Sequence, residues 1–195
     1  NSNENYIYVI NHDGSNSDNF PFMIDEKIKS GVALADFNSN ELDDIVFGTD
    51  DDNLYVLLDN GTILEGFPFL ADDKIQAAPS ILKVGSEKII FFGSKDDQIY
   101  SIDSSGHQIF SYSTDGNVYS SPSFINIEGY GLVVFFGSDD GYVYALDMQG
   151  NDIPGWPINI GNDVVGSVLF EDLNGDSYPE VISFSNSKIS LHSLD

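Results

Sequence analysis

Cysteine is absent from this chain of 195 residues, and basic side chains are scarce. Without cysteine there is no disulfide, no Cys-ligated zinc, no iron–sulfur cluster and no thiol catalysis. Seven Lys and Arg residues stand against 32 Asp and Glu residues, a net charge of −25. Such a field repels nucleic acid and anionic lipid and attracts cations. No apolar run reaches the ~18 residues of a membrane span, so we expect neither a nucleic-acid partner nor membrane insertion.

Apolar residues are plentiful, at 41% hydrophobic and 13% aromatic. That composition supports a packed core and argues against disorder. The chain begins at Asn1 without a signal-like segment, and we expect it to be a processed or excised piece of something longer.

Three landmarks recur along the chain, and repeats of this length decide the fold. The first is an alternating strand that runs to a turn glycine, at Gly14, Gly61, Gly106 and Gly150, which are 47, 45 and 44 residues apart. The second is an aromatic cluster: Phe20-Pro21-Phe22, Phe67-Pro68-Phe69, Phe110-Ser111-Tyr112 and Trp156-Pro157-Ile158. The third is a β-rich run that ends in Phe-Gly, at Phe47-Gly48, Phe92-Gly93 and Phe136-Gly137, whereas the fourth copy, Val181 to Ser185, has lost the glycine.

Each period reads as four strands, which in the second unit span about 31–36, 43–49, 53–59 and 62–69. Alternation, β-branched and aromatic residues, and the Asn60-Gly61 hairpin pair favour strands over helices. Four antiparallel strands every ~45 residues are typical of propeller blades. We therefore predict an all-β fold, a β-propeller of four-stranded antiparallel blades. A β-sandwich and a β-helix are the alternatives, but neither accounts as well for the regular repetition.

The predicted propeller is partial and fills residues 1–195 as a single domain. Its repeats span approximately 1–30 (half a blade), 31–75, 76–117, 118–163 and 164–195. The first and last strands share one phase of the repeat, so each end would leave an edge to cover. A piece of a larger propeller is the preferred interpretation. Self-association of two chains into a closed propeller comes second, and a four-bladed ring is the third alternative.

Two loops between first and second strands are dense in oxygen donors. Alternate positions in a tight loop turn side chains toward one point, and calcium takes 6–8 oxygen ligands including a backbone carbonyl. The predicted ligands are Asp36, Asn38, Asn40, Leu42 (by its carbonyl) and Asp44, and then Asp172, Asn174, Asp176, Tyr178 (by its carbonyl) and Glu180. We predict about two Ca²⁺ sites of structural character, although solvated turns without an ion remain the alternative.

An EF-hand does not fit these loops. It requires glycine at the sixth position and glutamate at the twelfth, where the first loop has Glu41 and Phe47. The other two repeats lack the carboxylate cluster and place Lys83 and Asn126 at its first position. No calcium site is expected there.

The pattern Asp-x-Asn-x-Asn/Asp-x-x-x-Asp/Glu followed by a run ending in Phe-Gly resembles the FG-GAP or VCBS repeat. That repeat builds the propellers of integrin α-subunits and bacterial surface proteins. The segment Val143 to Pro157 is also similar to secreted bacterial propellers and, more distantly, to quinoprotein blades. The resemblance implies about seven blades, calcium in the loops, an extracellular or cell-surface location (or a periplasmic one), and a role in adhesion or ligand binding.

The expected function is a binding or scaffold module for an unidentified protein or carbohydrate ligand, not an enzyme. A quinone-dependent dehydrogenase would need basic residues around its cofactor, and only seven Lys and Arg residues exist. A polysaccharide lyase on a propeller is a further alternative, which would need a base such as Lys or Arg near a metal and an acidic sugar. No nucleophile elbow or phosphate loop is present. An inert spacer of a surface protein is the third alternative.

Overall fold

The computed structural model describes residues 5–185 and 189–194, and its regular elements in these ranges are all β-strands. Seventeen strands form five antiparallel sheets. In the described ranges no helix is long and apolar enough to cross a membrane. The prediction of an all-β fold with four-stranded antiparallel sheets is confirmed.

The strands follow one another as a meander, so neighbours in sequence are neighbours in each sheet. The first sheet, which we call the half-sheet, contains β1 (Asn5–Ile7) and β2 (Phe22–Ile24). Sheet β3–β6 contains β3 (Ile28–Ala35), β4 (Asp44–Thr49), β5 (Asn53–Leu57) and β6 (Phe69–Leu70). Sheet β7–β10 contains β7 (Ser80–Val84), β8 (Glu87–Gly93), β9 (Gln98–Asp103) and β10 (Gln108–Ser113). Sheet β11–β14 contains β11 (Ser123–Ile127), β12 (Gly131–Gly137), β13 (Tyr142–Leu146) and β14 (Ile158–Asn159). Sheet β15–β17 contains β15 (Leu169–Glu171), β16 (Glu180–Phe184) and β17 (Ile189–Ser193).

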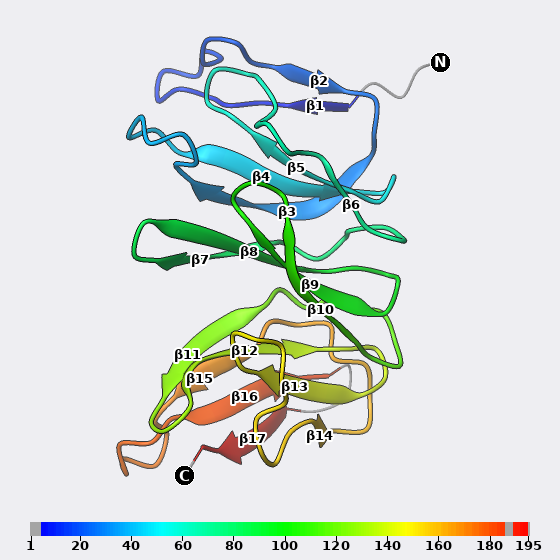
Figure 1. The fold of residues 1–195 in the computed structure, drawn as a ribbon, viewed down its shortest axis with the longest axis vertical. Helices are drawn as coiled ribbons and strands as arrows, with labels where there is room; N and C mark the ends of the chain where they lie inside the picture. Colours follow the sequence, from blue (N-terminus) through cyan, green and yellow to red (C-terminus); the bar gives the residue numbers. More distant parts are fainter. Residues whose placement is uncertain (1–4, 186–188, 195) are drawn as a thin grey trace.

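Along the long axis of the molecule the half-sheet lies at one end, followed by sheet β3–β6 and sheet β7–β10, while sheets β11–β14 and β15–β17 overlap at the other end (Figure 1). Each of the four junctions between successive sheets holds its own apolar cluster. The second strand of each complete sheet is packed on both faces, and in β4 all six residues are buried. This is why the Phe-Gly runs are apolar at consecutive positions: both faces of the strand meet a neighbouring sheet. Burial of each large side chain contributes about 1.5–3 kcal/mol.

The fourth strand is shorter than predicted wherever its aromatic cluster contains proline. The predicted strand 62–69 reduces to Phe69–Leu70, because Gly66 turns the chain with a φ of 91° and Pro68 has no N–H to donate to a ladder. In sheet β7–β10 the proline is replaced by Ser111, and β10 extends over six residues. The aromatic clusters therefore mark the approach to the fourth strand more than the strand itself.

Glycine sets the distance between neighbouring sheets. A Cβ added at Gly48, Gly93 or Gly137 would lie 2.2–2.4 Å from the β-branched side chain that opens the next sheet, a distance at which atoms overlap. The partners of these glycines are Ile75, Val118 and Val164. The register of β16 with β17 places Phe184 at the position that Gly48 occupies in β4.

Candidate metal loops and the clefts beside them

The two predicted ligand loops have the same backbone shape. Loop 36–44 connects β3 to β4, and loop 172–180 connects β15 to β16. The fourth and sixth residues of each loop have positive φ, at Ser39 (63°), Glu41 (70°), Gly175 (82°) and Ser177 (75°). Non-glycine residues rarely adopt this conformation, so its recurrence at matching positions shows one loop design used twice.

The first carboxylate of each loop holds the turn together. Asp36 accepts hydrogen bonds from the N–H groups of Ser39 (2.6 Å) and Glu41 (2.9 Å). Asp172 accepts the equivalent bonds from Gly175 (2.7 Å) and Ser177 (2.9 Å). Both carboxylate oxygens therefore face into the curve of the loop.

Positions three, five and nine repeat this arrangement. The side-chain oxygens at positions three and five each accept the N–H two residues later, at 3.1 and 2.9 Å in the first loop and 2.9 and 2.8 Å in the second. At position nine, Asp44 accepts the N–H of Phe37 (2.7 Å) and Glu180 accepts that of Leu173 (2.8 Å). All the predicted side-chain ligands thus belong to one network in each loop.

The donor set consists of hard oxygens, which suits calcium better than a softer metal. In the ranges that the structure describes, no three acidic, histidine or cysteine side chains gather as a ready metal centre. Yet Asp44 is fully buried and Glu180 is 8% exposed. The pKa of Asp44 is raised, chiefly by burial and further by the charges of Asp59 and Asp36. A buried carboxylate that is disfavoured in its charged form is one that a bound cation would stabilise.

Asp59 lies outside loop 36–44 but joins its hydrogen-bond network, a role that the sequence did not predict. Its Oδ1 accepts the side-chain amides of Asn40 (2.8 Å) and Asn38 (3.3 Å), and its own N–H donates to Asp44 (2.9 Å). This role could not be predicted from the sequence, because Asp59 directly precedes the Asn60-Gly61 turn and an aspartate there is already explained by the hairpin.

Two lysines face the same loop from the next sheet. Lys83 and Lys88 line a cleft of about 630 Å³ together with Asp36, Ser39 and Asp43. The Lys88 ammonium lies 5.7 Å from the centre of the Phe37 ring. The pKa of Asp36 is lowered overall: burial raises it, but backbone hydrogen bonds and the charge of Lys88 outweigh that effect.

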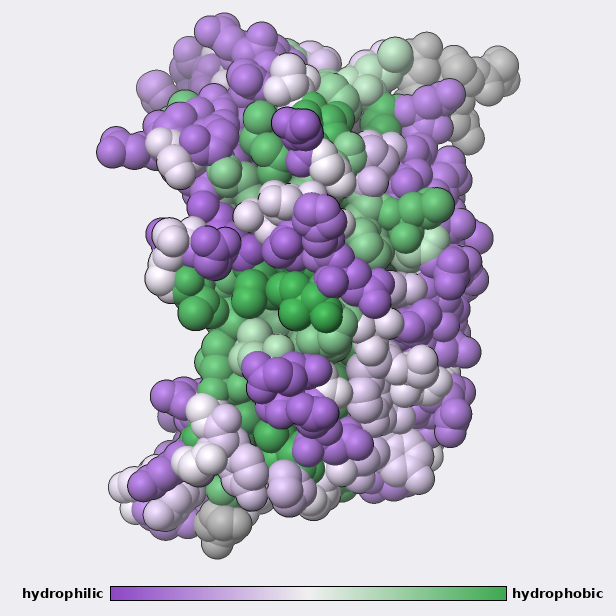
Figure 2. All heavy atoms as spheres, in the orientation of Figure 1, coloured by the Kyte–Doolittle hydropathy of each residue, from purple (hydrophilic) through white to green (hydrophobic). Residues whose placement is uncertain are grey.

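A second cleft, of about 770 Å³, separates the half-sheet from β3 and loop 36–44. Five of its apolar lining residues are exposed to solvent: Tyr8, Ile10, Val32, Leu34 and Leu42. On the face seen in Figure 2, hydrophobic side chains reach the surface between strongly polar ones. We call this cleft the half-sheet cleft.

A third cleft, of about 660 Å³, lies at the other end of the row of sheets, next to loop 172–180. Tyr130, Trp156 and Tyr178 line it, with Glu128 beside them. Tyr178 is the seventh residue of its loop, as Leu42 is in the half-sheet cleft. The seventh position therefore supplies an exposed side chain to a cleft in both loops.

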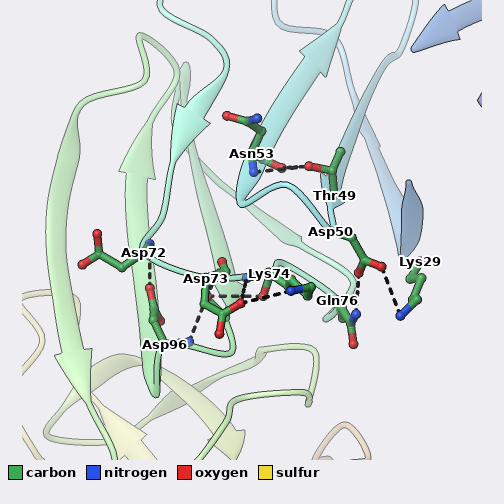
Figure 3. Close-up of polar contacts among 10 residues, drawn as sticks. Lys29, Thr49, Asp50, Asn53, Asp72, Asp73, Lys74, Gln76 and Asp96 are labelled. Atoms are coloured by element: carbon green, nitrogen blue, oxygen red, sulfur yellow. Dashed lines mark hydrogen bonds and ion pairs between the residues drawn. The ribbon is translucent and has the colours of Figure 1, made fainter. Parts of the chain in front are cut away.

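The acidic turns between second and third strands connect neighbouring sheets. Asp50 binds Gln76 and forms an ion pair with Lys29 at 3.1 Å, and Asp96 accepts the N–H of Asp72 at 3.0 Å (Figure 3). These carboxylates already have protein partners, so their role is to join sheets.

Comparison with solved structures establishes the β-propeller fold. The BBS1N structure in complex with ARL6DN, soaked with lead, matches at a TM-score of 0.65 and 13% identity, over 98% of this chain and 59% of that one. BamB from Moraxella catarrhalis matches at 0.60 and 19% identity, over 88% and 53% of the two chains. Sqt1 from Saccharomyces cerevisiae matches at 0.63 and 16% identity, over 83% and 43%. The chain thus spans about half the length of the structures that it resembles.

No family model and no curated protein matches this chain. The resemblance to FG-GAP or VCBS repeats therefore stays a prediction, while the propeller architecture is shown by the sheets and by the structural neighbours.

Proposed function

We propose that this propeller is a non-catalytic binding module whose half-sheet cleft takes up a β-hairpin from outside the described residues. The observation that carries the proposal is the half-sheet itself. The third strands β5, β9 and β13 each lie between two strands, whereas β1, at the same place in the repeat, is in a sheet of two strands with β2. The half-sheet cleft is found where the two inner strands of a complete sheet would lie.

Ile28 supports this interpretation. Its counterparts Ile75, Val118 and Val164 pack on the glycine of the preceding sheet and are at most 1% exposed. Ile28 is only half-buried. A partner that supplies a β-hairpin would cover it, extend the half-sheet by strand addition and bury the apolar lining of the cleft.

The partner strand nearest β1 should carry glycine opposite Ile28, as β4, β8 and β12 do for the sheets that follow them. A second copy of this chain fits this requirement less well. Its β15–β16 hairpin would bring Phe184 to that position. We therefore propose a hairpin from outside the described residues, supplied by a longer form of this protein or by a partner, and self-association is the alternative that the experiment must separate.

A peptide with the sequence of residues 118–137, the inner hairpin of sheet β11–β14, is a suitable probe because it already fills this place in a complete sheet. We expect saturable binding by calorimetry, lost in the Leu34→Asp protein and kept in a Val84→Asp control. The same peptide with Gly137→Val should not bind. No binding at all, or equal binding of both peptides, would contradict the proposal.

Light scattering after size exclusion tests the alternative occupant. A dimer that Leu34→Asp converts to a monomer would assign the half-sheet cleft to a second copy and overturn the choice of another hairpin. A monomer together with specific peptide binding would support it. An inert spacer predicts a monomer and no peptide binding.

We propose in addition that each ligand loop binds one Ca²⁺. Matching networks of oxygen donors and the buried carboxylates of Asp44 and Glu180 support it. In such a site Asp36, Asn38, Asn40 and Asp44, or Asp172, Asn174, Asp176 and Glu180, would hold the ion with the carbonyl of Leu42 or Tyr178. The ion would supply positive charge that holds a polar loop in place. We expect an affinity in the range of extracellular modules, and a measured value in that range would support a location outside the cytosol.

Calorimetric titration with calcium tests these sites. Two sites are expected, of which Asp36→Ala removes one and Asp172→Ala the other, while the exposed control Asp25→Ala retains both. A chelator should lower the melting temperature. Absence of heat together with an unchanged melting temperature would rule out the calcium proposal. The enzyme alternatives predict turnover in quinone-dependent oxidase or uronate lyase assays, where we expect none.

A further inference from the structure

Sheet β7–β10 carries lysines where sheet β3–β6 carries aspartates. Lys83 and Lys88 are partners across the β7–β8 ladder. In the preceding sheet, the register that pairs Ala35 with Asp44 places Asp36 and Asp43 at the equivalent sites. Two acidic positions of the repeat have therefore become two basic ones, in a chain that has only seven basic residues.

The inverted pair faces the loop of its neighbour. Ile81 and Lys83 alternate along one face of β7, and Lys88 and Ile90 along the same face of β8; Ile81 and Ile90 pack in the apolar junction with sheet β3–β6. Lys83 and Lys88 lie at the end of the ladder next to Ile81 and Ile90. They line the same cleft as Asp36, Ser39 and Asp43 of the loop. The position of Lys88 over the Phe37 ring holds its ammonium group at the loop.

Like charges placed directly opposite each other on two strands destabilise a sheet. Lys83 and Lys88 therefore need an acidic neighbour, and loop 36–44 is the one that their cleft provides. The lysines are confined to the side of loop 36–44 that faces the following sheet, because the half-sheet cleft on its other side is lined by no lysine among the described residues.

We propose that Lys83 and Lys88 are a built-in counter-ion of loop 36–44 that competes with a divalent metal ion for this loop. The inference rests on the calcium proposal and adds to it a competing positive charge at loop 36–44. The two lysines partly neutralise the negative charge of loop 36–44. The loop therefore binds the ion more weakly than it would without them, and its metal-free form is more stable than it would be without them.

The test uses calcium calorimetry in an Asp172→Ala background, where only loop 36–44 remains to bind. Replacement of both lysines, Lys83→Gln with Lys88→Gln, should raise the affinity of this loop roughly three- to thirtyfold, the range for charges that interact through partly screened solvent. The matched control, Lys74→Gln with Lys95→Gln, changes the net charge equally away from the loop. The gain should shrink as ionic strength rises, because the interaction is electrostatic.

A second readout does not need calcium. In the presence of a chelator, the Lys83→Gln, Lys88→Gln protein should melt at a lower temperature than the control pair, because its loop has lost its counter-ion. Equal affinities and equal metal-free melting temperatures in the two pairs would overturn the inference while leaving calcium binding intact. If the parent chain binds no calcium, the calcium proposal fails, and the competition inferred here fails with it.

Discussion

Replacement of Gly93 by alanine tests the sheet spacing on which the whole row depends. The new methyl group would lie 2.4 Å from both Cγ1 and the carbonyl oxygen of Val118, more than ~1 Å inside normal carbon contact distance. Overpacking costs about 1–3 kcal/mol. Because one of the clashing atoms belongs to the backbone and cannot rotate away, we expect the upper end, about 3 kcal/mol.

Chemical unfolding in urea, followed by far-ultraviolet circular dichroism and by the fluorescence of Trp156, measures this loss. For a chain of 195 residues, each kcal/mol lowers the melting temperature by about 2–4 °C, so the variant should melt about 6–12 °C below the parent. Gly166→Ala is the matched control, since its methyl group would meet Phe184 at an ordinary 3.7 Å. We expect that control to change stability by less than ~1 kcal/mol.

A Gly93→Ala protein as stable as the parent would refute the reasoning. It would mean that the two sheets are free to move apart and that glycine is not what fixes their distance. Equal losses in Gly93→Ala and Gly166→Ala would also refute it, because the two positions differ in the space available to a methyl group.

Three further predictions concern individual polar contacts. Asp44→Asn replaces one of two accepting carboxylate oxygens with an NH₂ group that faces an N–H. It should lower the free energy of unfolding, measured in urea without metal, by about 2 kcal/mol. Ser120→Ala removes a buried hydroxyl that both donates to and accepts from the backbone of Gly137 and should cost about 1 kcal/mol by the same assay. Burial and the hydrogen bond to Asp152 raise the pKa of Tyr112 to about 12, so its contribution to stability is fully present below pH ~10 and is lost as pH rises through about 12; ultraviolet titration should show this late ionisation disappear in Tyr112→Phe and move to lower pH in Asp152→Asn.

The repeat predicted the fold because each landmark has a physical task that the structure confirms. Phe-Gly runs form strands packed on both faces, and their glycines let the next sheet approach. Strand length was less predictable, since a proline within the aromatic cluster shortens the fourth strand where serine does not. The exchange of glycine for Phe184 became visible only from strand register, because the sequence suggested a match one residue later, at Ser185.

The loops were predictable as local features, and their contacts with other segments were not. Regular spacing predicted five oxygen-bearing positions in each loop, and in the structure the two loops have the same pattern of hydrogen bonds. Asp59 joins the first network from a hairpin that sequence assigns to a turn. Lys83 was interpreted only as the loss of a site in its own repeat, since a single repeat does not show that its lysine faces the preceding one.

Phe184 also limits how an array of this kind can grow. Tandem duplication adds a unit by copying an existing one, and every copied unit here would open with isoleucine or valine at the position that needs glycine opposite it. Beyond β16 such a copy would meet an aromatic ring. New units of the same kind therefore fit between the existing sheets better than against the face of β16 that carries Phe184.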